Sequence, residues 1–149
     1  MFVDFWLMVV VYWLIIVVYL KLKYMENYQY SFEKLDVWKN SRVFNVKIYN
    51  LTNKFPNYER FGLVSQIRRA AVSIISNIAE GSSRSSLKEQ VRFTEIAYGS
   101  ALEVYCQMIV ALDLKYITES EFNEIDLLLK EITNKLYALK NSQLKRIVA

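Results

Sequence analysis

The strongest constraint in this sequence is a long helical pattern that few residues interrupt. After Leu35, apolar residues recur every three or four positions, and the whole chain of 149 residues has only three glycines and one proline. This spacing places apolar side chains on one face of a helix, and so few glycines and prolines leave little room for a many-stranded fold. The pattern is interrupted at Pro56, at residues 81–86 and before Thr118. It therefore predicts an all-α fold, an antiparallel up-down-up-down four-helix bundle with short connections.

Two helix starts and one helix end carry terminal signals. Ser86 and Thr118 each precede a glutamate by three positions, which is the spacing of a capping box that satisfies free backbone N–H groups. Gly81 lies at the expected end of the second helix, where a residue of positive φ closes the last turn. The expected helices cover residues 35–54, 60–80, 86–114 and 118–144.

The apolar stripes predict which side chains face the core. Expected inward residues are Leu35, Trp38, Phe44, Val46, Ile48, Tyr49, Leu51 and Phe55 in the first helix and Ile67, Ala71, Ile74, Ile75 and Ile78 in the second. They are Leu87, Val91, Thr94, Tyr98, Leu102, Tyr105, Ile109 and Leu112 in the third helix, and Phe122, Ile125, Leu128, Leu129, Ile132, Leu136 and Leu139 in the fourth. Small residues around Gly99 predict a close helix crossing, and Cys106 is expected to be a small core residue.

Residues 1–24 differ from the rest, because no charged residue occurs between Phe5 and Leu20. One interpretation is a membrane anchor, although 16 uncharged residues are short against the roughly 20 of a spanning helix. In that case Lys21 and Lys23 hold the bundle in the cytoplasm. The other is an upstream translation artefact with a true start at Met25, which gives a cytoplasmic protein and no membrane partner. The expected layout is a hydrophobic extension, a leader and a four-helix bundle over residues 1–24, 25–33 and 34–144.

The composition argues against several kinds of active site. The chain has no histidine and one cysteine, so it lacks the commonest general base and the residues of a multi-cysteine metal site. Glu80 and Glu103 could form a pair of acid/base carboxylates, but no other group supports that chemistry. We therefore expect a non-enzymatic protein with no catalytic residue, metal or cofactor. Residues 25–149 hold 17 basic and 14 acidic residues, a modest excess of +3.

Several short segments carry a resemblance to a known family. They are Leu-Asp-Val-Trp at 35–38, Gln-Ile-Arg-Arg-Ala-Ala-Val-Ser-Ile at 66–74, Ser-Asn-Ile-Ala-Glu-Gly at 76–81, Arg-Phe at 92–93 and Ala-Tyr-Gly-Ser-Ala-Leu-Glu at 97–103. Over about residues 32–140 the chain resembles the bacterial S23 ribosomal proteins encoded within intervening sequences of 23S rRNA genes. The accessory variability protein of diversity-generating retroelements is a relative of these proteins. Ile75 stands where the family often has proline, and residues 1–24 have no counterpart, which favours a start at Met25.

This resemblance implies a bundle that assembles into a ring, with a pentamer as the expected homo-oligomer. For the retroelement relatives it also implies a basic surface that binds nucleic acid and a reverse transcriptase. Our expectation is a non-enzymatic self-assembling bundle that offers a basic surface to RNA or a nucleoprotein partner. The alternatives are a protein-interaction scaffold without nucleic-acid binding and a membrane-anchored bundle.

Two sets of residues are candidates for these roles. The basic residues expected to contact nucleic acid are Arg60, Arg68, Arg69, Arg84, Lys88 and Arg92. The alternative for them is an ordinary solvated face with weak local ion pairs. The residues expected to serve structure or assembly are Asn77, Glu80, Gly81, Gly99 and Glu103.

Overall fold

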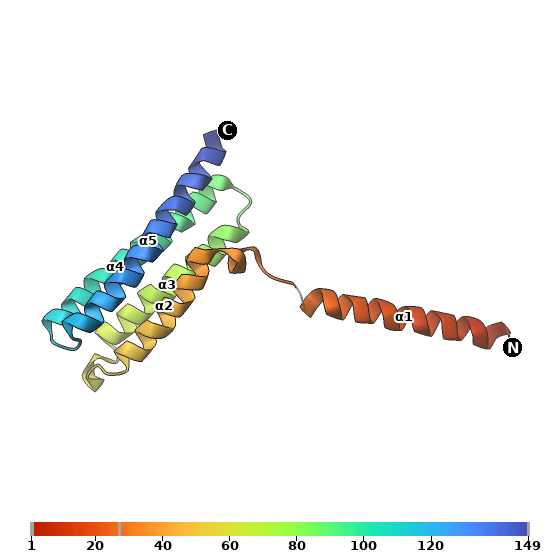
Figure 1. The fold of residues 1–149 in the computed structure, drawn as a ribbon, viewed down its shortest axis with the longest axis horizontal. Coiled ribbons are helices and arrows are strands. Elements are labelled where there is room, and N and C mark those ends of the chain that lie inside the picture. Colours follow the sequence, from red (N-terminus) through yellow and green to blue (C-terminus); the bar gives the residue numbers. More distant parts are fainter. Residues whose placement is uncertain (1, 27, 149) are drawn as a thin grey trace. The chain divides into compact units, whose positions relative to one another are not determined.

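The computed structural model describes residues 2–26 and 28–148, which form two compact units, Met1–Tyr30 and Ser31–Ala149 (Figure 1). The first unit contains one helix, α1 (Phe2–Glu26). The second contains the 3₁₀ turns η1 (Ser31–Lys34) and η2 (Asn57–Glu59) and the helices α2 (Asp36–Thr52), α3 (Leu63–Ser83), α4 (Leu87–Asp113) and α5 (Glu119–Val148). The described residues contain no strand, and the predicted all-α class is confirmed.

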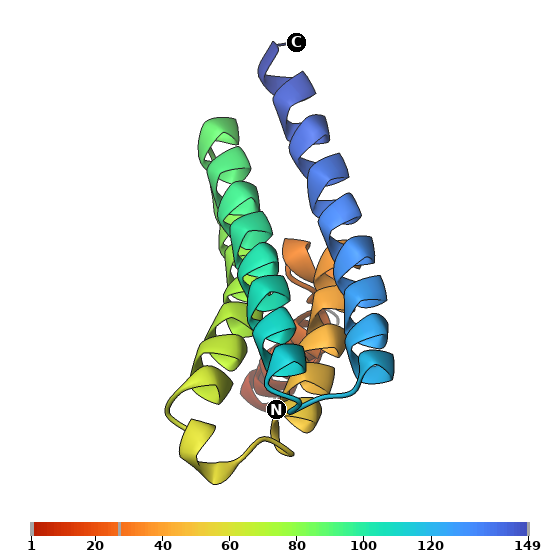
Figure 2. The same cartoon turned by 90° about the vertical axis from the view of Figure 1, so that its left-hand side faces the viewer.

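The four helices of the second unit pack as an antiparallel bundle (Figure 2). Each helix runs beside its neighbours in the chain, and α2 closes the bundle against α5. Side-chain contacts fix the register of α2 on α3, where the Asn45 amide donates to the Ala71 carbonyl at 2.5 Å. They also fix α4 on α5, where the Thr94 hydroxyl donates to the Gln143 side chain at 3.0 Å. The up-down-up-down order is the one that the periodicity predicted.

The core lies entirely within the second unit. Its fully buried large side chains include Phe44, Ile48, Ile67, Ile74, Met108, Ile125, Ile132 and Leu136. The inward faces predicted for α3 and α5 are therefore confirmed, except that Ile75 on α3 is only partly buried and lies outside the core.

On α2 the core is formed by only part of the predicted set. Phe44, Ile48 and Leu51 are buried, but Val46 and Tyr49 are exposed. On α4 the prediction is right for Val91 and Thr94, and Tyr105 and Leu112 pack against the core, but Tyr98, Leu102 and Ile109 are exposed. The buried face consists mostly of smaller residues, and its members after Thr94 are Ala97, Ser100, Ala101, Val104, Met108 and Ala111. They suit that face because α4 packs closely against both α3 and α5. Cys106, expected in the core, is also exposed.

Neither Gly81 nor Gly99 has the role that the sequence predicted for it. Gly81 does not end α3, since the helix continues to Ser83 and no glycine has positive φ. A Cβ atom at Gly81 would lie 2.9 Å from the Cβ of Phe93, so this is where α3 and α4 cross closely. A Cβ atom at Gly99 would meet no atom within 4 Å, so the crossing predicted there is wrong.

One of the two predicted capping boxes forms. The Thr118 hydroxyl accepts from the Glu121 N–H at 3.2 Å, and the Glu121 carboxylate accepts from the Thr118 N–H at 3.0 Å. Ser86 occupies the N-cap of α4, but its side chain makes no capping hydrogen bond. The capping box predicted at Ser86 therefore marks the start of α4 correctly, but its hydrogen bonds do not form. The first-turn N–H groups of α4 receive no side-chain cap from Ser86.

The helix of the first unit continues to Glu26, two residues beyond the predicted hydrophobic extension. The predicted leader overlaps the end of α1 and most of η1. Among the described residues, α1 is the helix long and apolar enough to cross a membrane, over Trp6–Lys23 with a mean hydropathy of 1.9.

Candidate nucleic-acid interface

The six basic residues that the sequence singled out do not form one cluster. Helix α3 has 21 residues and is therefore about 31 Å long at 1.5 Å per residue. Arg60 and Arg68 lie toward its beginning, whereas Arg84 follows its end. Lys88 and Arg92 lie in the first two turns of α4, beside the end of α3. The bundle thus separates the set into two groups, with Arg60, Arg68 and Arg69 toward the beginning of α3 and the other three at its end.

Arg68 completes the end of α2 rather than facing a partner. Its guanidinium donates to the Thr52 hydroxyl at 2.8 Å, to the Asn53 side chain at 2.8 Å and to the Tyr49 carbonyl at 3.3 Å. It also lies 4.7 Å from the centre of the Tyr49 ring. A cation at a helix C-terminus stabilises carbonyls that lack an intrahelical donor. Arg68 is therefore best explained as a structural residue.

Arg60 and Arg69 differ in how they are paired. Arg60 lines a polar hollow of about 220 Å³ beside Arg68 and makes no ion pair among the described residues. The Arg69 guanidinium lies 3.7 Å from the Glu103 carboxylate on α4 and donates to Gln66 at 2.8 Å. This exposed pair links α3 to α4 and contributes little stability.

The other three predicted residues lie at the α3–α4 connection. Arg84 pairs with Glu80 one turn earlier, and its guanidinium lies 4.9 Å from the centre of the Phe93 ring. Arg92 pairs with Glu89 at 3.3 Å. Lys88 makes no ion pair or side-chain hydrogen bond within the described part of the chain.

The end of α5 adds two cations that the sequence analysis did not include. The Lys140–Glu95 ion pair, at 2.7 Å, sets the last turns of α5 beside the first turns of α4. Lys145 and Arg146 follow, and neither has an ion pair among the described residues. Figures 1 and 2 both show the α3–α4 connection and the C-terminal turns of α5 at the same end of the bundle.

We call this cluster the basic end, and it comprises Arg84, Lys88, Arg92, Lys145 and Arg146. Two of the five are paired, Arg84 with Glu80 and Arg92 with Glu89. Lys88, Lys145 and Arg146 have no ion pair among the described residues. The antiparallel order alone brings the start of α4 beside the end of α5, and this was the signal that could have added Lys145 and Arg146.

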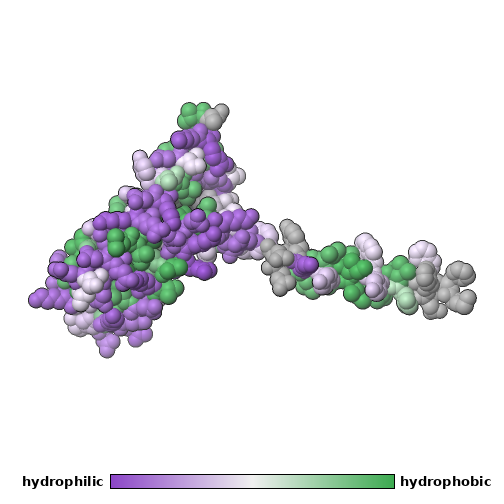
Figure 3. All heavy atoms as spheres, viewed as in Figure 1, coloured by the Kyte–Doolittle hydropathy of each residue, from purple (hydrophilic) through white to green (hydrophobic). Residues whose placement is uncertain are grey.

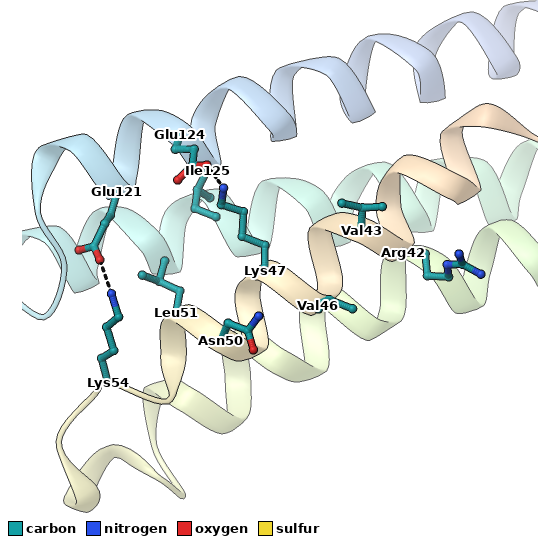
Figure 4. A pocket seen from close by; sticks show the side chains of 10 residues that line it. All are labelled: Arg42, Val43, Val46, Lys47, Asn50, Leu51, Lys54, Glu121, Glu124 and Ile125. Carbon is teal, nitrogen blue, oxygen red and sulfur yellow. Dashed lines mark hydrogen bonds and ion pairs between the residues drawn. The ribbon is translucent and has the colours of Figure 1, made fainter.

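A hollow on another side of the bundle is different in character (Figure 4). It is a groove of about 630 Å³ between α2 and α5, and most of its charged groups are paired. Lys47 pairs with Glu124, and Lys54 lies 2.8 Å from Glu121 across the groove. The hydrogen bond from Lys54, followed by that from the Thr118 N–H, lowers the pKa of Glu121 from 4.5 to about 2. Arg42 also lines the groove, and it lies 5.5 Å from the centre of the Trp38 ring without an ion pair among the described residues.

Asn77 belongs to the seam between α3 and α4. Its amide donates to the Ser73 carbonyl at 2.7 Å and to the Ser73 hydroxyl at 3.0 Å. The Ser73 hydroxyl lies 2.8 Å from that of Ser100 on α4. Two polar residues of adjacent helices are thus joined in a small hydrogen-bond network at the crossing.

Among the described residues, no group of three or more aspartate, glutamate or cysteine side chains is placed to hold a metal ion. The raised pKa of Tyr116 comes first from its hydrogen bond with Tyr58 and then from burial and Glu59. These three residues tie the α2–α3 connection to the α4–α5 turn.

The fold and the charge distribution therefore define a class of protein, a four-helix bundle with a cluster of cations at one end. A similar bundle is known from a crystal structure of a protein of unknown function from the S23 ribosomal protein family of Bacteroides thetaiotaomicron VPI-5482. The two proteins share 28% sequence identity and superpose with a TM-score of 0.65. The match covers 70% of this chain and 97% of the Bacteroides protein. Residues 33–138 match the 23S rRNA-intervening sequence protein family, and the chain belongs to that family. No curated protein matches it.

Proposed function

We propose that the bundle is a non-enzymatic RNA-binding protein that holds the RNA backbone at its basic end. The observation that carries the proposal is the convergence of cations from α3, α4 and α5, three of which have no ion-pair partner in the described residues. Phosphate contacts by lysine and arginine supply sequence-independent affinity and fix how a protein lies on nucleic acid. Membership of a family named for an rRNA intervening sequence supports RNA as the partner.

The start of α4 adds a second source of attraction for phosphate. Its N-terminal N–H groups carry a partial positive charge and receive no side-chain cap from Ser86. Lys88 lies in the same turn. The backbone dipole and the side-chain charges therefore act in the same direction at this end of the bundle.

A matched pair of charge variants tests this proposal. Lys88→Gln/Arg146→Gln removes two unpaired cations from the basic end, and Arg60→Gln/Lys115→Gln removes two from the opposite end. Binding of a single-stranded RNA and of an RNA hairpin is measured by fluorescence polarisation across a salt series. Losing two phosphate contacts lowers the slope of log affinity against log salt by about 1.4 for a single strand. We expect this loss only for the first variant.

Two outcomes contradict the proposal. Equal weakening by both variants indicates diffuse attraction to a basic protein rather than a defined end. No salt-dependent binding by the unchanged protein leaves the interaction scaffold without nucleic-acid binding as the better function.

We also propose that the bundle self-associates through the outer face of α4. Tyr98, Leu102 and Ile109 lie on this face, and they are the residues whose periodicity predicted a core position. Hollows of about 350 and 180 Å³ follow the same face between α4 and α5. A second copy that covers this face removes apolar surface from water. The family resemblance makes a closed ring, expected to be a pentamer, the favoured assembly.

Light scattering of the protein at micromolar concentration tests the assembly. We expect an oligomer that Leu102→Glu dissociates, because the new carboxylate would be buried without a partner. Val46→Glu, an equally apolar exposed position on α2, serves as the control. A monomeric unchanged protein, or equal effects of the two substitutions, contradicts this assignment.

A further inference from the structure

Between Trp6 and Leu20, helix α1 has apolar side chains on every side, and all of them are exposed. From Trp6 to Leu20 the described side chains are tryptophan, tyrosine, methionine, leucine, isoleucine and valine, each between 39% and 73% exposed. Exposed apolar surface this continuous is unusual for a protein in water and marks an interaction surface. The visible side of α1 in Figure 3 is coloured mainly as apolar.

The distribution of these residues identifies the kind of partner. A helix that lies on a membrane surface needs one polar face, and α1 has none between Trp6 and Leu20. A helix that is apolar all round is instead buried in a protein or spans a membrane. Valine and isoleucine are also poor helix formers in water, so packing or lipid has to stabilise the helical form. In a hydrocarbon environment a helix satisfies all its backbone groups internally.

The length and the charges of α1 match a bilayer. The apolar window Trp6–Lys23 has 18 residues, about 27 Å of helix, against a hydrocarbon thickness of about 30 Å. Lys21 and Lys23 lie at the C-terminal edge of the window, where lysine side chains reach from the hydrocarbon boundary into the headgroup region. Trp6 and Tyr19 lie near its two ends, as interfacial aromatic residues do.

We infer that α1 is a single membrane-spanning helix that anchors the bundle to a lipid bilayer. Lys21 and Lys23 keep its C-terminal end, and therefore the bundle, on the cytoplasmic side. This inference concerns a part of the chain outside the family match at residues 33–138 and does not depend on RNA binding.

A charge in the middle of α1 tests the inference on the full chain. The chain is synthesised in the presence of phosphatidylcholine and phosphatidylglycerol vesicles, which are washed with alkaline carbonate and floated on a density gradient. Leu14→Arg introduces a charge near the middle of the window, and Leu127→Arg on α5 makes the same change at another exposed leucine. We expect the ratio of vesicle-bound to free protein to fall about 100-fold for Leu14→Arg and to stay unchanged for Leu127→Arg.

Protease added outside the vesicles gives a second readout. We expect it to digest the bundle and to leave a protected fragment that contains α1. Complete digestion places α1 on the membrane surface and overturns the inference, as does a wild-type chain that carbonate removes from vesicles. A defined oligomer in water that Leu14→Arg dissociates also overturns it, because α1 then binds other copies of itself.

Discussion

The close crossing of α3 and α4 makes a sharp prediction for Gly81. The Cβ atom of alanine at this position would lie 2.9 Å from the Cβ of Phe93, whereas two carbon atoms prefer about 3.5 to 4.0 Å. Rotation of the Phe93 ring cannot relieve this contact, since its Cβ position is fixed by the backbone of α4. The two helices have to move apart, and overpacking of this kind costs about 1 to 3 kcal/mol.

Alanine also brings a gain, because it is a better helix former than glycine by about 1 kcal/mol. The net effect expected for Gly81→Ala is a loss of about 1 kcal/mol in the free energy of unfolding. Gly99→Ala is the matched control, since its added Cβ meets nothing within 4 Å. It keeps the gain without the contact and should stabilise the bundle by about 1 kcal/mol.

Urea unfolding of the bundle (residues 25–149), followed by its helical circular dichroism, measures both changes. The two variants should differ by about 2 kcal/mol with opposite signs relative to the unchanged protein, at constant dependence on urea. A Gly81→Ala variant as stable as Gly99→Ala would show that α3 and α4 do not cross closely at this position.

Three further substitutions test local contacts by urea unfolding. Lys115 follows α4 with a φ of 59°, and the Tyr116 N–H donates to the Ala111 carbonyl at 2.9 Å. Because glycine adopts this left-handed conformation without strain, Lys115→Gly should stabilise the bundle by about 1 kcal/mol. A destabilised variant would contradict this explanation. The folded-state pKa of Glu121 is about 2 and its ordinary value 4.5, so its stabilisation is complete above pH 4.5 and lost as the pH falls toward 2. Glu121→Gln should remove about 1 kcal/mol of that pH dependence, after allowance for solvent screening, and an unchanged acid profile would argue against the pair with Lys54. Arg68→Met should lower the free energy of unfolding by about 1 to 2 kcal/mol, because the end of α2 loses the hydrogen bonds that Arg68 donates. An unchanged stability would show that Arg68 has no structural role.

Periodicity predicted the faces of α3 and α5 because most of their large apolar residues lie on one side, with few exceptions such as Val72 and Leu127. It was misleading on α4, where both sides are apolar. Large side chains such as Leu102 suggested the core, but the seam with α3 and α5 takes small ones such as Ala97 and Ala101. Which of two apolar stripes faces inward depends on the distance between helices, and a single helix's pattern does not encode that distance.

The candidate interface was predictable only in part for a similar reason. Residue type and spacing identify Arg84, Lys88 and Arg92 as neighbours across one connection. They do not show that the Arg68 side chain is bound to the end of α2 through its contacts with Tyr49 and Thr52. The contribution of α5 could have been predicted from the antiparallel order, which places the end of α5 beside the start of α4, whereas the register of the two helices follows from tertiary packing.

The crossing at Gly81 and the basic end belong to one arrangement. The missing side chain at Gly81 lets α4 approach until the Phe93 ring lies beside the end of α3, and Arg84 packs against that ring. Glu80, one residue before Gly81, pairs with the same guanidinium. Glu80 and Gly81, at the end of the segment 76–81, therefore hold the Arg84 side chain in one orientation. If so, Gly81→Ala should weaken RNA binding by more than its loss of about 1 kcal/mol in stability can explain, because the protein stays folded while Arg84 is displaced.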